Sequence, residues 1–239
     1  MAGPRKSGGL RPRPMVAGTW HPDATMRLPN AVHESGSWRI REIVPNFTLE
    51  DVWALPVDGG AEDFPKLLEL ATSLDPANAS SLPARALWRI RDRLGAWFDL
   101  GRITGGGAGP RAADDTEPDG GEAALPIPGT EQRSLAERLP DDLRNSPWDH
   151  DFGSLPFQPL YRIDHEAAAE ISNKTVHGVM HLAWAEQGGG RFRGQMAVYV
   201  KPRGAFGKAY MAFIKPFRHL IVYPALTRQI ERQWKDRQR

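Results

Sequence analysis

The amino-acid sequence predicts an α+β domain in which a curved antiparallel sheet wraps around a long C-terminal helix. Residues 175–187 and 191–202 alternate large apolar side chains with other types and are joined by a glycine run, a pattern typical of a β-hairpin. The residues that follow, to about Lys235, repeat large apolar side chains at three- and four-residue spacing, which indicates an amphipathic helix.

The composition excludes several kinds of site. The 239 residues include no cysteine, which removes disulfides, thiolate metal ligands and cysteine nucleophiles. The net charge is +2 with neutral histidines, and basic residues gather near both ends while acidic residues gather in the middle. Nucleic-acid binding favours a basic face with interleaved aromatic side chains. We expect the Lys and Arg side chains near the two ends of this sequence to be solvated instead. We therefore expect no nucleic-acid partner.

Motifs that would name a reaction or a compartment are missing. The sequence has no phosphate loop, nucleophile elbow, zinc spacing or dinucleotide fingerprint, so we expect no cofactor and leave open whether the protein is an enzyme. No uninterrupted apolar run reaches the roughly 20 residues that span a bilayer, and the basic N-terminal segment lacks the apolar stretch of an export signal. We expect a cytoplasmic protein without a membrane span.

The N-terminal part predicts an arm followed by two strands. Residues 1–36 are rich in Pro, Gly and Arg and lack either hydrophobic period, so we expect a disordered basic arm. A single domain is predicted over residues 37–235. Apolar and polar side chains alternate in segments 38–44 and 49–56, which predicts two short strands. Pro56 with the Gly59-Gly60 pair should end the second strand.

Two helices and an insertion come next. Asp63 as the N-cap and Pro65 in the first turn predict a short helix. Apolar side chains at helical spacing predict a second, amphipathic helix over residues 84–100. Residues of about 104–134 are small, acidic and broken by proline, so we expect a mobile surface insertion; whether it acts as a lid is left open.

The C-terminal half predicts the sheet and its closing helix. Residues 135–144 suggest a short helix or turn, and strands are predicted near 157–163 and 166–173, before the hairpin. Pro216 and Pro224 should bend or break the closing helix. Its predicted buried stripe consists of Met211, Ile214, Phe217, Leu220, Ile221, Leu226, Ile230 and Trp234.

One face of the predicted hairpin is too mixed to be an ordinary solvent face. Strand alternation places His177, His181, Gln195 and Tyr199 on it, opposite an apolar face. We predict a ligand-binding site from these four residues together with Trp53 and Phe217. Histidines hydrogen-bonded on a half-buried sheet are the plainer alternative. At ~3.3 Å per residue the two histidine backbones lie about 13 Å apart, too far to share one ion, so no metal site is predicted.

Two chemical alternatives remain open. Tyr199 or His181 could donate a proton to a carbonyl compound, with Asp51 or Asp99 as the orienting acid, although each aspartate could equally cap or turn the chain. A cationic cluster at the junction between hairpin and helix could hold an anionic head group, or could consist of solvated stems. Its members are Lys201, Arg203, Lys208, Lys215, Arg218 and His219.

The amino-acid sequences of several segments resemble a bacterial family known as domain of unknown function 2867. The likeness covers about Trp38 to Trp234 apart from the insertion, and it implies no activity and no site residue. It rests on the segments WRIREIVPNFTLEDVWALP, ARALWRIRDRLG, TVHGVMHLAW, QMAVYVKPRG and YMAFIKPFRHLIVYPAL.

More loosely, the order of elements is similar to the helix-grip, or START-like, superfamily, which includes polyketide cyclases and lipid carriers. In that superfamily the sheet wraps the last helix and leaves a cavity, so the likeness implies a pocket and no particular reaction. The long insertion and the prolines of the closing helix depart from its pattern.

The function expected from these observations is binding of a small hydrophobic or amphipathic molecule in a cavity between the sheet and the C-terminal helix. One alternative is a cyclase- or isomerase-type enzyme acting on a polyketide-like or other carbonyl substrate. Another is an interaction partner of an oxidoreductase, suggested by the charged ends. The sequence identifies no catalytic residue and no oligomeric state.

Overall fold

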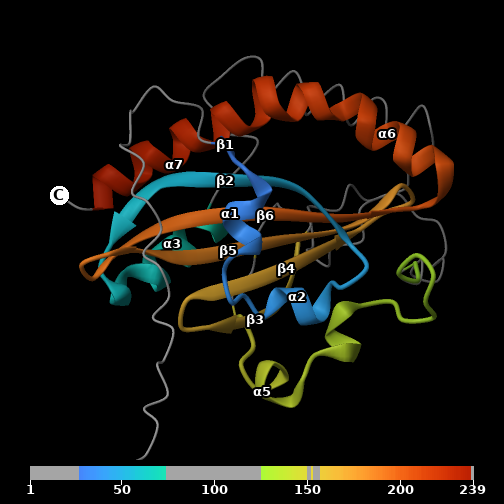
Figure 1. The fold of residues 1–239 in the computed structure, drawn as a ribbon, viewed down its shortest axis with the longest axis horizontal. Helices are drawn as coiled ribbons and strands as arrows, with labels where there is room; N and C mark the ends of the chain where they lie inside the picture. The colour runs from blue at the N-terminus through green and yellow to red at the C-terminus, as the bar shows by residue number, and fades with distance from the viewer. Residues whose placement is uncertain (1–26, 74–124, 150–151, 153–156, 238–239) are drawn as a thin grey trace, which may run out of the picture.

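The computed structural model describes residues 27–73, 125–149, 152 and 157–237 (Figure 1). Within α6, η4 and α7, the side chains of residues 217, 221, 222 and 225 are not among those described. The helix predicted over residues 84–100, with Asp99, lies outside the described residues, as do most of the predicted arm and residues 104–124 of the predicted insertion.

Six antiparallel strands form one curved sheet, in the order β1-β2-β6-β5-β4-β3 (Figure 1). Each neighbouring pair is antiparallel, and a long C-terminal helical segment crosses one face. The predicted fold class is therefore confirmed. The strands are β1 (Arg27–Leu28), β2 (Thr48–Gly59), β3 (Gln158–Ile163), β4 (Glu166–Ser172), β5 (Val176–Gly188) and β6 (Arg191–Pro202).

The hairpin of β5 and β6 is the predicted one. The two strands pair from Val176 opposite Pro202 to Gly188 opposite Arg191. The turn needs positive φ at Gly188, Gly189 and Gly190, with values of 94°, 63° and 73°, which glycine adopts without steric cost.

Two predictions for the N-terminal strands need correction. Residues 38–44 were predicted as a strand, but Ile40–Ile43 form helix α2, in which Ile40 and Ile43 are both buried. In so short a run the apolar residues fit both the strand period and the helix period. Burial of two side chains that are three residues apart favours the helix. Pro56 was expected to end β2, which instead continues to Gly59; the proline lies where the pairing with β6 shifts between Ala54 and Asp58, so its missing N–H breaks no regular ladder.

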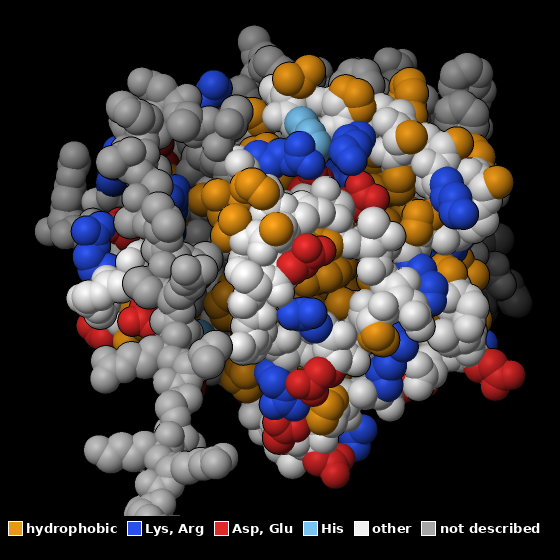
Figure 2. Space-filling view, in the orientation of Figure 1, with side chains coloured by type: hydrophobic (Ala, Val, Ile, Leu, Met, Phe, Trp, Pro, Cys, Tyr) orange, Lys and Arg blue, Asp and Glu red, His pale blue; other side chains and the backbone are white. Residues whose placement is uncertain are grey.

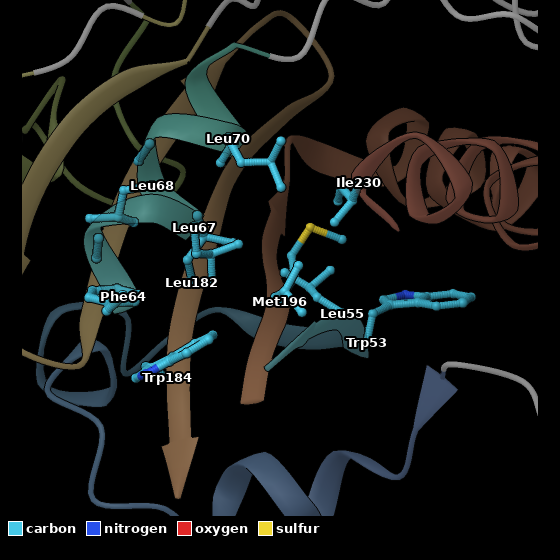
Figure 3. Packing of buried hydrophobic residues seen from close by; sticks show 14 of the residues in the cluster. Trp53, Leu55, Phe64, Leu67, Leu68, Leu70, Leu182, Trp184, Met196 and Ile230 are labelled. Carbon is cyan, nitrogen blue, oxygen red and sulfur yellow. The ribbon is translucent and has the colours of Figure 1, made fainter. Parts of the chain in front are cut away.

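One face of the sheet packs against helix α3 (Phe64–Thr72) and the C-terminal segment, which consists of α6 (Gly204–Phe217), η4 (Arg218–Val222, a π-helical turn) and α7 (Tyr223–Arg237). Asp63 precedes α3 as predicted, and its carboxylate accepts a hydrogen bond from the Gly60 N–H at 2.9 Å. The core between these layers includes Trp53, Leu55, Phe64, Leu67, Leu68, Leu70, Leu182, Trp184, Met196 and Ile230 (Figure 3).

The opposite face of the sheet is also covered. Helices α2 and α5 (Asp141–Arg144) and the 3-10 turn η3 (Leu135–Arg138) supply a second core, and His33 of α1 (Asn30–Glu34) is buried beside Tyr199 of this core. Residues 125–134, at the end of the predicted insertion, contribute the fully buried Ile127. This core includes Ile40, Ile43, Val52, Ile127, Leu135, Leu143, Tyr161, Ala168, Val179, Ala197 and Tyr199. Side chains on both faces are thus withdrawn from water.

The predicted buried stripe of the closing helix is confirmed near its two ends and is wrong in the middle. Met211, Ile230 and Trp234 are buried, but Leu220 is 77% exposed. A π-helical turn contains more residues than an α-helical turn, so the side chains beyond it are rotated relative to a continuous α-helical pattern. The prolines do not end the helix: Pro216 lies inside α6 and Pro224 is the second residue of α7, on either side of η4.

The start of α6 approaches the sheet more closely than any side chain would permit. A Cβ atom on Gly207 would lie 2.2 Å from the carbonyl oxygen of Thr175. The same oxygen accepts a hydrogen bond from the Arg203 N–H at 2.7 Å. Glycine at position 207 is therefore required for α6 to dock.

We predict that Gly207→Ala lowers the free energy of unfolding by about 1–3 kcal/mol, because the backbone must move to admit the methyl group. The intrinsic helix propensity of alanine would act in the opposite direction. Urea denaturation checks this, with Lys208→Ala at the exposed neighbouring position as the control. A Gly207→Ala variant as stable as the control would contradict the close approach.

Candidate functional site

A buried carboxylate lies between the sheet and the C-terminal segment. Asp51 follows a register shift between Leu49 and Asp51 in β2, and its side chain is fully buried. Its Oδ2 accepts hydrogen bonds from Arg218 Nη2 and, at 3.4 Å, from the Tyr223 hydroxyl. Its Oδ1 lies 2.6 Å from His219 Nε2 and 3.5 Å from Arg27 Nε. We call Asp51, Arg218, His219 and Tyr223 the Asp51 centre.

The π-helical turn explains how one carboxylate meets three side chains of a single helix. In π-helical geometry the backbone bonds run from residue i to i+5, so residues 218 and 223 lie one above the other. The Tyr223 hydroxyl accepts a hydrogen bond from Arg218 Nη2 at 2.6 Å, and the Arg218 guanidinium lies 5.5 Å from the Tyr223 ring centroid. Single π-helical turns inside α-helices are frequent at functional sites.

The protonation of the Asp51 centre follows from its surroundings. Burial raises the pKa of Tyr223 to about 12, with Arg218 opposing and Asp51 assisting the rise. At neutral pH the hydroxyl therefore keeps its proton, accepts from Arg218 and donates to Asp51. Burial would lower the pKa of Arg218, but its contacts with Tyr223 and Asp51 outweigh burial and raise it, so the guanidinium stays charged.

His219 is the part of the centre nearest to water. Its side chain is 20% exposed, whereas that of Asp51 is 0% exposed. The rings of Trp53 and Tyr223 flank the imidazole, with centroids 5.9 and 6.1 Å away. Because an ionised carboxylate only accepts hydrogen bonds, Nε2 must carry the hydrogen that Asp51 receives.

An open pocket of about 690 Å³ lies next to the Asp51 centre, between the β1–β2 edge and α6. Arg27 belongs both to the pocket wall and to the ion-pair contacts of Asp51. Figure 2 shows Lys and Arg side chains together with acidic ones near the C-terminal segment on this face. The pocket is lined by Arg27, Leu28, Pro29, Asn30, Thr48, Leu49, Glu50 and Lys215.

The sequence-predicted site residues do not form one wall. His177, His181, Gln195 and Tyr199 are buried on the face opposite the C-terminal segment. Trp53 lies on the other face, where its ring centroid is 4.4 Å from that of Tyr223. The apolar face of the hairpin, not the mixed face, packs against α3 and α7. The side chain of Phe217 lies outside the described ones.

The mixed face is a buried polar layer organised by two glutamates of β4. Glu166 Oε2 lies 3.3 Å from His181 Nε2, and Glu170 Oε2 lies 2.7 Å from His177 Nε2. Both glutamates are 2–3% exposed. Strand pairing explains the match, because Ala168 is opposite His181 and Ser172 is opposite His177, which places each glutamate diagonally across from its histidine.

Other groups donate further hydrogen bonds to these two glutamates. Glu166 accepts hydrogen bonds from the Arg39 N–H, at 2.9 and 3.0 Å, and from the Tyr161 hydroxyl at 3.0 Å. Glu170 accepts from the Ser134 hydroxyl and, at 3.0 Å, from the Leu135 N–H. Such satisfied carboxylates fasten η3 and the start of α2 to the sheet, which is a structural role.

Sequence reasoning missed His33, which lies in the segment expected to be a disordered arm. It belongs to α1 and is fully buried, with Nδ1 2.6 Å from Gln195 Oε1. Its ring centroid is 5.1 Å from that of His181 and 5.9 Å from that of Trp38. Burial, reinforced by His181, lowers the pKa of His33 to about 4. The apolar neighbours Leu28 and Val32 were the only sequence signal for this packing.

The predicted cationic cluster separates into individual contacts. Arg203 donates to the carbonyl oxygens of Asn173, Pro126 and Leu125, so it joins residues 125–126 to the end of β4. Lys201 lies over the Phe47 ring, 5.8 Å from its centroid. Only Lys215, Arg218 and His219 are at the pocket or the Asp51 centre.

Comparison with known proteins gives a family. A family model described as protein of unknown function (DUF2867) matches residues 43–225. The chain belongs to this family. Neither the curated proteins nor the solved structures gave a significant match. The matched range in this DUF2867 member includes Asp51, Arg218, His219 and Tyr223.

Two further findings concern the parts of this DUF2867 member that the structure describes. In those ranges no helix is both long and apolar enough to cross a membrane. In the same ranges, no group of three or more His, Cys, Asp or Glu side chains is placed to hold a metal ion.

Replacing Asp51 by alanine should lower the free energy of unfolding by about 3 kcal/mol, because the variant leaves Arg218 in the interior without its carboxylate. Chemical denaturation measures this. Glu50→Gln, at the neighbouring and more exposed carboxylate, should cost less than about 1 kcal/mol. Equal effects of the two substitutions would contradict a special role for the buried carboxylate.

The low pKa of His33 predicts a loss of stability in mild acid. The unfolded chain takes up a proton near the ordinary histidine pKa of about 6.5, whereas folded His33 resists protonation down to about pH 4. The His33 contribution is therefore complete above pH 6.5 and is lost between about pH 6.5 and pH 4, amounting to about 2 kcal/mol at pH 4.5.

His33→Gln retains an amide that can bond Gln195 but does not titrate. The stability difference between pH 7 and pH 4.5, measured by urea denaturation, should be about 2 kcal/mol smaller in this variant than in the parent. An identical pH dependence of the two proteins would show that His33 is not held neutral in the fold.

Proposed function

We propose that this protein binds a small amphipathic molecule through an anionic group, in the pocket between the β1–β2 edge and α6. The observation that carries the proposal is the open space of about 690 Å³ with Arg27 and Lys215 in its wall. Ligand pockets of drug-sized molecules measure roughly 300–1,000 Å³, so the space suits a small organic compound.

The charges around the pocket support an anionic ligand. Arg27, Lys215 and Arg218 bring three positive charges, and Glu50 and Asp51 bring two negative charges, so one positive charge is in excess when His219 is neutral. Lys215 Nζ is 3.6 Å from Glu50 Oε2, a loose contact that an incoming carboxylate or phosphate can share.

The apolar part of the ligand has its own surface. Leu28, Pro29 and Leu49 line the same pocket, next to the polar side chains of Asn30 and Thr48. An alkyl chain or ring can lie against these three residues while its anionic end faces the cations. The combination favours an amphipathic molecule over an inorganic anion or a hydrocarbon.

The likeness to the helix-grip superfamily is part of this proposal. The curved antiparallel sheet and the closing helix support it. Beneath α7, however, Tyr223, Ile230 and Trp234 are buried in one core with Trp53, so we place the ligand beside that core. A cytoplasmic location and a bacterial origin stay predictions from the sequence.

Binding can be tested with octanoate and octanol as probes, followed by backbone amide chemical shifts. Octanoate should shift amides of Thr48, Leu49 and Lys215, and octanol, which lacks the charge, should bind more weakly. Lys215→Gln should weaken octanoate binding about tenfold, equivalent to about 1.4 kcal/mol.

Arg191→Gln, at an exposed arginine of the hairpin turn region that faces Asp58, is the matched control and should leave octanoate binding unchanged. Shifts elsewhere in the protein, or a Lys215→Gln variant that binds octanoate as well as the control does, would refute this pocket.

A further inference from the structure

The Asp51 centre has the chemistry of a proton-transfer pair that ligand binding alone would not use. With the Nε2 hydrogen donated to Asp51 at 2.6 Å, neutral His219 carries its lone pair on Nδ1. The structure gives Nδ1 no hydrogen-bond partner among the described residues, and the His219 side chain is 20% exposed. A base of this kind is oriented and ready for an external proton.

Asp51 is well placed to stabilise His219 in its protonated form. It is fully buried, and its position is fixed from the other side by Arg218 and by the Tyr223 hydroxyl. A carboxylate held in this way keeps the imidazole in one tautomer and favours the imidazolium that forms when Nδ1 takes up a proton. Asp51 is therefore a positioning residue and His219 the group that would meet the substrate.

Arg27 connects the two features. It lines the pocket, and its Nε is 3.5 Å from the same Asp51 oxygen that receives the His219 bond. Lys215, also in the pocket wall, precedes His219 by four residues on the same helical segment. A ligand whose anionic group meets Arg27 is therefore held beside the Asp51 oxygen that also receives the His219 bond; His219 itself is not among the residues that line the pocket.

We propose that His219 removes and returns a proton at a carbon atom next to a carbonyl group of the bound molecule, which would make the protein an isomerase-type enzyme for anionic carbonyl compounds. This proposal rests on the proposed binding function. Nδ1 takes the proton, the C–H electron pair moves into the carbonyl to give an enolate, and the imidazolium returns a proton to the same or a conjugated carbon. The positive charge of Arg27 favours the enolate.

The reaction consumes nothing, because the proton that leaves the substrate is held on His219 and given back. The oxidation state of the substrate as a whole does not change. In heavy water the returned particle is a deuteron, so exchange of the hydrogen next to the carbonyl group reports the step without knowledge of the natural substrate.

The test uses 2-oxooctanoate, which has a carboxylate, an adjacent carbonyl group, exchangeable hydrogens at C3 and an alkyl chain. Proton NMR in heavy water should show faster loss of the C3 signal with the protein than with an equal concentration of free imidazole. His219→Asn should lower this exchange rate at least about 100-fold while leaving the affinity for octanoate unchanged. His165→Gln, at an exposed histidine that stacks on Phe192, is the control and should exchange like the parent.

The outcomes separate the two proposals. If octanoate and 2-oxooctanoate both fail to bind, the proposed function fails and this inference fails with it. If they bind but exchange is no faster than with imidazole, or if His219→Asn exchanges like the parent, the proton-transfer role is overturned and the binding function stands.

Discussion

The position of the C-terminal segment depends on one buried interaction, that of the Asp51 carboxylate with Arg218, His219 and Tyr223. An ionised carboxylate in a protein interior costs several kcal/mol unless it is paired and hydrogen-bonded. A regular α-helix would not bring residues 218, 219 and 223 onto the same carboxylate, and the π-helical turn does so. The local distortion of the helix and the buried charge on β2 therefore support each other.

Carboxylates are also buried on the other face of the sheet, where they too are paired and hydrogen-bonded but have a structural role. Glu166 and Glu170 accept hydrogen bonds from histidines, hydroxyls and backbone N–H groups, and their histidine partners are fully buried. These pairs hold covering elements onto the sheet. The Asp51 centre differs in one respect, since His219 retains access to water and its partner Asp51 contacts Arg27 of the pocket wall. In this protein, solvent access rather than polarity distinguishes the candidate site from the polar clusters that only stabilise the fold.

The sequence predicts the sheet and the closing helix well because strand alternation and helical spacing are local and long. It does not predict which face of the hairpin meets the helix, because that depends on what covers the mixed face. The covering residue His33 lies in a segment whose composition resembles a tail. Leu220 likewise keeps a helical spacing that the π-helical turn overrides. Asp51 and His219 are separated by more than half the chain, so no local pattern joins them.

The most direct test of this account is a double-mutant cycle between Asp51 and Arg218, with alanine at each position and at both, measured by urea denaturation. The account predicts that the pair is coupled by about 2 kcal/mol or more, because each partner is costly to bury without the other. Effects that add within about 0.5 kcal/mol would show that the carboxylate does not hold the helix in place.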